Sequence, residues 1–235
     1  MHAVEAISSA TVKKLFCLPL LLFFAFLPLD SYAQFGPHAE EGFGVGGGYS
    51  SADNSSTISV SAGYVFQPAL EVGVAVGRNS SDNADLAATG VGPYVSVYPV
   101  RQGEDFPFSI VLNGSYSFQT FSGNQVDRLE SQGGSISGNS FSLSSGLFHA
   151  FDVNESLDIL PFAGVNYTRN KTEVSGGGQT ASNTEGTTSL ALSLSFEFKT
   201  SGSSSFVVTP STNIGDENSF FGISASFVIP SAPDQ

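Results

Sequence analysis

The sequence contains no tryptophan, and its single cysteine is Cys17. One cysteine in a chain of 235 residues cannot form an internal disulfide, which excludes a disulfide-stapled fold and a cysteine-based metal cluster. Basic residues are also scarce: 8 Lys and Arg stand against 21 Asp and Glu, so the net charge is −13. An acidic surface repels phosphate, which argues against nucleic acid as a partner.

Long apolar runs are missing as well. The longest, residues 15–29, follows Lys13 and Lys14 and ends before a stretch of small residues. This order is the layout of a secretory signal peptide, and the run is shorter than the roughly 20 residues of a membrane-spanning helix. We expect cleavage between Ala33 and Gln34. No later apolar stretch is long enough for a helical span, so the exported chain does not cross a membrane with helices.

From residue 42 onward, apolar and small polar residues alternate. In residues 188–198, for example, leucine and phenylalanine alternate with serine, alanine and glutamate. A period of two predicts β-strands with one apolar face, and no segment shows a helical stripe. The sequence predicts ten strands, at residues 42–50, 56–65, 69–78, 86–98, 106–120, 140–151, 157–170, 188–198, 205–209 and 219–229.

The connections between these strands alternate in length. The two longest, residues 121–139 and 171–187, are polar and both occupy odd places in the series, whereas the even places hold short turns. Odd and even connections of an up-and-down sheet lie at opposite ends. The sequence therefore predicts long loops at one end of the sheet and tight turns at the other.

The two faces of the predicted strands differ in a way that favours a membrane. The polar face is rich in Ser, Gly, Thr and Ala instead of the charges that keep a soluble surface solvated, which favours a barrel with an apolar exterior and a polar lumen. We expect a lipid-facing set of Val60, Val72, Val74, Leu190, Leu192 and Leu194. We expect a lumen lined by Ser59, Ser61, Gly73, Ala75, Asn113, Ser193 and Ser195.

Aromatic residues gather near the strand ends, as in the two interfacial girdles of membrane barrels. One group lies towards the short turns: Phe66, Tyr98, Phe106, Phe108, Phe151, Phe196, Phe198 and Phe227. The other lies towards the long connections: Tyr49, Tyr116, Phe118, Phe141, Tyr167 and Phe221. Aromatic core residues of a soluble sandwich are the alternative interpretation.

The chain resembles the small bacterial outer-membrane β-barrels typified by the OmpA and OmpX transmembrane domains. The resemblance is carried by YVFQPALEVG, GPYV, LPFAG and the last strand FGISASF. It implies an all-β, single up-and-down antiparallel transmembrane barrel that is exported through the periplasm and contacts outer-membrane lipid and the assembly machinery. Ten strands are preferred and eight, common among members, are the alternative. Family members often end on an aromatic residue, whereas Phe227 is followed by eight more residues.

The resemblance gives a division of the chain and one candidate charged site. The expected segments are a signal peptide at 1–33, a short lead at 34–41, the barrel at 42–229 and a periplasmic tail at 230–235. Three acidic residues follow or precede short turns, which places them at the periplasmic mouth: Glu71, Asp158 and Glu197. An acidic ring there would favour cations. The alternative is that these are mouth charges wetted by bulk water or paired with Arg101 and Lys199.

No catalytic, cofactor or metal site is predicted. Gly42, Gly44 and Gly47 match a dinucleotide fingerprint, but no helix follows them. His38 and His149 are the only histidines beyond the signal peptide, too few for a metal cluster.

The predicted function is therefore non-enzymatic: a structural or surface-interaction role, with a narrow passive pore as an addition. The alternatives are a secreted lipocalin-like barrel with an apolar ligand, and an adhesin that binds an extracellular ligand or surface through 121–139 and 171–187.

Overall fold

The alternating sequence folds into strands throughout the computed structural model, which describes residues 41–52, 54–66, 69–81, 85–200, 204–215 and 219–231. The expected signal peptide, its cleavage site between Ala33 and Gln34, most of the short lead and most of the tail lie outside the described residues. Among the described residues, no helix combines the length and apolar character needed to span a bilayer.

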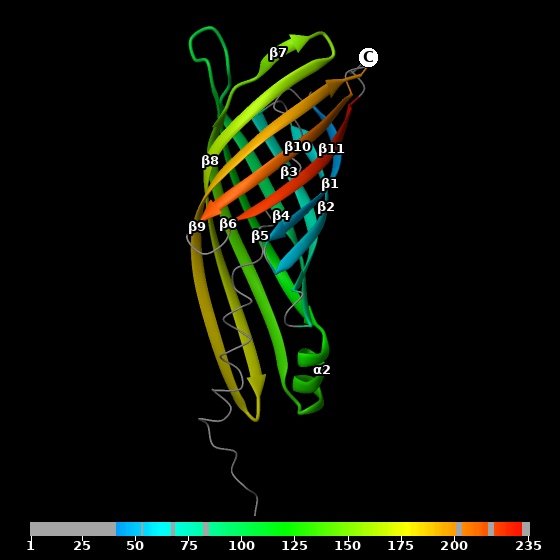
Figure 1. Ribbon diagram of the computed structural model, residues 1–235, viewed down its shortest axis with the longest axis vertical. Coiled ribbons are helices and arrows are strands. Elements are labelled where there is room, and N and C mark those ends of the chain that lie inside the picture. Colours follow the sequence, from blue (N-terminus) through cyan, green and yellow to red (C-terminus); the bar gives the residue numbers. More distant parts are fainter. Residues whose placement is uncertain are drawn as a thin grey trace, which may run out of the picture.

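Eleven strands and one short helix form the described chain (Figure 1). In order they are β1 (Gly42–Ala52), β2 (Ser55–Phe66), β3 (Leu70–Ser81), β4 (Leu86–Val100), β5 (Ser109–Ser122), α2 (Asn124–Ser131), β6 (Ser135–Phe148), β7 (Phe151–Asn154), β8 (Leu157–Gly176), β9 (Gln179–Lys199), β10 (Ser205–Gly215) and β11 (Phe220–Pro230).

Antiparallel pairing of these strands closes a barrel. Neighbours in sequence pair with each other, β1 pairs with β11, and β6 pairs directly with β8. The four-residue β7 pairs only with the start of β8 and stands outside the ring. The ten-strand prediction is therefore confirmed, and the eight-strand alternative is wrong.

The strands are strongly tilted. Cross-strand partners lead once around the barrel, starting at Asp158 on β8, whose partner is Glu197 on β9. The last partner on this path is Ser140 on β6, and it pairs with Asn170 on β8. The path returns further along the same strand instead of at its starting point, which is the stagger that a closed barrel requires. Residues far apart along the chain thus lie at similar depth in the lumen.

The two ends of the barrel differ, as Figure 1 shows. The end that carries β7 and both the start of β1 and the end of β11 has short connections; we call it the short-turn end. At the opposite end, β8 and β9 run well past β10 and β11, and α2 lies at the tips of β5 and β6. We call it the hairpin end.

Two connection predictions are wrong. Residues 171–187 are not a loop: β8 and β9 continue through them and join at Gly177 and Gly178, whose φ values of 59° and 76° form a tight hairpin turn. Beyond a bilayer both faces of a hairpin meet water, so its strands need no apolar face. In 121–139 the true connection is short and contains the helix α2, which the sequence analysis missed.

Candidate functional site

Clusters of apolar side chains lie inside the barrel near the short-turn end. Tyr98, Val111, Phe148, Ala150 and Leu160 form one cluster, and each is at most 6% exposed. A second cluster inside the barrel joins residues from four strands: Val65, Ala75, Tyr94 and Val228. Together the two clusters fill the lumen at this end with tightly packed side chains.

Glycines make room for the rings in these clusters. Gly73 faces the lumen opposite Tyr94, and a Cβ atom there would lie 2.5 Å from the tyrosine ring. The ring of Phe162 covers the facing pair Gly146 and Gly164 in the same way. Glycine is required at these positions because the neighbouring aromatic ring occupies the space of a side chain.

The three predicted mouth acids are buried near the short-turn end. Glu71 is 1% exposed, Asp158 0% and Glu197 1%. Asp158 and Glu197 are direct cross-strand neighbours, and Tyr98 lies within electrostatic range of both Glu71 and Glu197. The structure thus places Glu71 and Glu197 near one buried tyrosine, and Asp158 beside Glu197.

A cation partly neutralises this group. Lys199 Nζ lies 2.7 Å from Asp158 Oδ2, and Asp152 of β7 is a more distant partner at 3.9 Å. Lys199 ends β9 and reaches water at the mouth, and its hydrogen bond to Asp158 raises its pKa. The described residues contain no group of three or more His, Cys, Asp or Glu suited to hold a metal ion.

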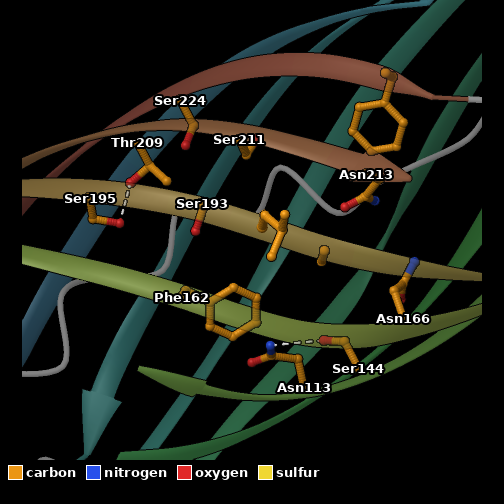
Figure 2. Close-up of a pocket in the computed structure, with 13 residues that line it drawn as sticks. Asn113, Ser144, Phe162, Asn166, Ser193, Ser195, Thr209, Ser211, Asn213 and Ser224 are labelled. Carbon is orange, nitrogen blue, oxygen red and sulfur yellow. Dashed lines mark hydrogen bonds between the residues drawn. The ribbon is translucent and has the colours of Figure 1, made fainter. Parts of the chain in front are cut away.

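Above the apolar clusters the lumen is polar and contains a cavity of about 80 Å³ (Figure 2). Its lining comes from β5, β6, β8, β9, β10 and β11, and none of the lining side chains is charged. Of the residues predicted for the lumen, Asn113, Ser193 and Ser195 line this cavity. Ser59 and Ala75 are buried elsewhere, and Ser61 and Gly73 are partly buried.

At the hairpin end, β6, β8 and β9 form a sheet that extends past the other strands (Figure 1). The last described pair between β9 and β10 is Ser189 with Gly215, so among the described strands residues 179–188 pair only with β8. Helix α2 places Val126 against Leu86, with Phe121 and Ile136 packed beside them.

The barrel exterior carries the apolar residues. Val60 is 57% exposed, Val74 52% and Leu190 45%; Val72 and Leu194 are exposed too, whereas Leu192 is half-buried. Thirty-three large apolar side chains are exposed among the described residues. A surface of this size cannot face water in a stable soluble monomer, and a buried polar lumen behind it is the membrane-barrel arrangement.

This chain is a membrane β-barrel. The lipocalin-like alternative needed a polar exterior, whereas the exterior of this barrel is apolar and much of its buried surface is polar. Aromatic rings also stand outward near both ends, including Phe66 and Phe151 at one and Phe118 and Phe221 at the other. Tyr98 is a correction, because its ring points into the lumen instead of joining the short-turn girdle.

No protein-family model and no curated protein matches the sequence. Solved structures similar in fold include the attachment invasion locus protein Ail of Yersinia pestis in complex with the heparin analogue sucrose octasulfate. It is 13% identical, with 80% of this chain and 97% of Ail covered and a TM-score of 0.37. The β domain of the Bordetella autotransporter BrkA is 12% identical, with 81% of this chain and 99% of that domain covered and a TM-score of 0.43. The outer membrane protein OprG of Pseudomonas aeruginosa is 14% identical, with 83% of this chain and 98% of OprG covered and a TM-score of 0.38.

Three features of this barrel escaped the sequence reasoning: the inward Tyr98, the helix α2 and the free edge of β9. Tyr98 has the same parity as Ser96 and Tyr94, which both face the lumen, so strand parity could have placed it. The free edge of β9 follows from how far β8 and β9 extend, which no polar pattern indicates.

Proposed function

We propose that this barrel is a surface-interaction protein: a membrane scaffold that holds an extended sheet outside the cell and binds an extended partner segment along the free edge of β9. The observation that supports the proposal is the stretch 179–188, which has a β-strand on one side only. Backbone N–H and C=O groups along such an edge are the template for strand addition.

The chemistry of this edge suits strand addition. Natural proteins commonly block exposed edges with lysine, proline or a bulge. The sequence QTASNTEGTT contains no lysine and no proline, and its one charge is Glu185, which accepts a hydrogen bond from Asn183 at 3.0 Å. The register with β8 continues without a bulge to Gly176 and Gln179. The edge is thus regular and unblocked.

The extended sheet is also held in place before any partner arrives. Lys171 and Glu173 form an ion pair at 2.6 Å, and the hydroxyls of Ser175 and Thr180 lie 2.9 Å apart across the hairpin. Residues 135–148 of β6 support the other side of β8 from Phe162 to Ser175. A preorganised strand loses little conformational entropy on binding, which favours affinity.

The apolar clusters near the short-turn end support a scaffold role over permeation. Val111 is fully buried and Leu160 is 2% exposed, so the lumen is obstructed at this depth. A narrow passive pore would have to pass through this packed region. We therefore place the function on the extended sheet and treat conduction as the weaker candidate.

Shortening the hairpin tests the proposal. Residues 172–183 are replaced by Asn-Gly, which joins the register partners Lys171 and Thr184 through a tight turn and leaves the barrel unchanged. We expect cells that carry this variant to lose attachment to protein-coated surfaces, while the barrel still shows heat-modifiable migration in gels.

A side-chain exchange is the matched control. Thr180→Ser with Ser182→Thr alters the surface of β9 but keeps its backbone edge. Attachment should survive this exchange, because strand addition depends on main-chain hydrogen bonds. Unchanged attachment after hairpin shortening would contradict the proposal.

A further inference from the structure

The lumen cavity is closed towards the short-turn end. Phe162 lines the cavity and also packs against the cluster that contains Tyr98, Phe148 and Leu160, so the floor of the cavity is the top of that cluster. Each of these three side chains is at most 6% exposed. Tightly packed side chains of this kind obstruct passage of a solute towards the short-turn end.

The cavity reaches the hairpin end on one side. Its lining includes Asn213 near the end of β10 and Phe220 at the start of β11, which form the last described register pair between these strands. The wall formed by β10 and β11 stops here, while β9 continues outward. The cavity is thus a well, closed below and adjacent to the outer rim.

The well offers hydrogen-bonding groups without charge. Serine hydroxyls of four strands and three asparagine amides face it: Ser144, Ser193, Ser195, Ser211, Ser224, Asn113, Asn166 and Asn213 (Figure 2). Asn113 Nδ2 donates to Ser144 Oγ at 3.0 Å, but Asn113 Oδ1 accepts no hydrogen bond from any described residue. Hydroxyls and amides donate and accept, which matches a ligand whose groups do both.

The well also has apolar surface. The Phe162 ring is fixed against Gly146 and Gly164, because these glycines leave the space that the ring occupies. A fixed ring beside several hydroxyls and amides provides one flat face for C–H groups and a set of orienting polar contacts.

From this geometry we infer that the well binds a small neutral polyhydroxylated molecule, up to the size of one sugar ring, that enters from outside the cell. Anions have no cation to pair with among the lining residues. A cavity of about 80 Å³ is also too small for a longer glycan, of which only a terminal sugar would enter. This site is separate from the β9 edge, so either proposal can fail without the other.

Glucose is the probe for the test, with glucuronate as its charged counterpart. Saturation-transfer NMR on the folded protein in detergent micelles should show transfer to glucose, with a Kd of about 1 mM, and about tenfold weaker transfer to glucuronate. Transfer of the same size in empty micelles, or equal binding of both sugars, would overturn the inference.

Two variants locate the binding. Ser193→Leu fills the well and should weaken glucose binding at least about tenfold, whereas Leu194→Phe, one residue along on the outer face, should leave it unchanged. If Ser193→Leu does not fold, Asn113→Ala removes polar partners without adding volume and should weaken binding by a similar factor. Undiminished binding in the folded variant would place the sugar elsewhere and refute the well.

Discussion

Lys199 Nζ lies 2.7 Å from Asp158 Oδ2, and the two residues differ sharply in exposure: the lysine side chain is 40% exposed and the aspartate 0%. The lysine thus reaches from the wet mouth of the barrel to a carboxylate that is sealed from water. Asp158 has Glu197 as its cross-strand neighbour, so the lysine also offsets repulsion between two buried acids.

Lys199→Met should lower the free energy of unfolding by about 1–3 kcal/mol, because a buried carboxylate loses its charged partner. In the Asp158→Asn background the same substitution should have a smaller effect. Denaturant unfolding of both single variants and the double variant in lipid vesicles measures the coupling. Additive effects of the two changes would contradict the pairing.

The ion pair between Lys199 and Asp158 predicts that the stability of the barrel depends on pH in the alkaline range. The pKa of Lys199 is raised in the folded state by its hydrogen bond to Asp158. A raised pKa means that the stabilisation is present below the unfolded-state pKa of about 10.4 and is lost as the pH rises through the folded-state pKa. Unfolding curves of the native protein and Lys199→Met should therefore converge at strongly alkaline pH.

Val74→Arg should destabilise the barrel by about 2–4 kcal/mol, because Val74 is 52% exposed on the outer face and an arginine there meets hydrocarbon. Ser193→Ala in the lumen is the control and should be nearly neutral. Unfolding in vesicles gives both values. Equal tolerance at the two positions would mean that Val74 does not contact lipid.

Gly73→Ala should cost about 1–3 kcal/mol, because its Cβ would lie 2.5 Å from the ring of Tyr94 and the ring would have to leave its place in the lumen. Gly114→Ala is a matched control, since the nearest atom to a Cβ there is a Leu143 methyl group at an ordinary 3.5 Å. A smaller loss of stability at Gly73 than at Gly114 would argue against the packing of Tyr94.

Removing the two rings at the floor of the lumen should open a channel. Tyr98 and Phe148 stack edge-to-face with ring centroids 6.2 Å apart. Planar-bilayer recordings should show no steady conductance for the native protein and a cation-preferring conductance for Tyr98→Ala/Phe148→Ala, since Glu71 and Glu197 lie nearby. Native channels as large as those of the variant would show that the rings do not obstruct the lumen.

The strand pattern was predictable because a bilayer makes the outer face apolar. Residues such as Val60 and Leu190 alternate with small polar residues, so parity alone indicates the direction of each side chain. The same contrast disappears outside the membrane. Thr172 and Glu173 of β8 are both polar although they lie on opposite faces, and the hairpin was therefore predicted as a loop.

Helix α2 left little trace in the sequence for a different reason. It has eight residues, and among them only Val126 is buried, so no apolar stripe repeats along it. The candidate site was partly predictable. The three acids could be assigned to one end from their distance to short turns, but the approach of Glu71 and Glu197 to Tyr98 depends on the stagger of the barrel.

The seam between β1 and β11 joins the two most distant segments of the barrel, with Gly42 opposite Pro230. Until that seam forms, both terminal strands expose a row of backbone amides that hydrocarbon cannot solvate. Insertion and closure of this ring must consequently proceed together, and a nascent chain that lacks its final strand has no stable resting state within the lipid.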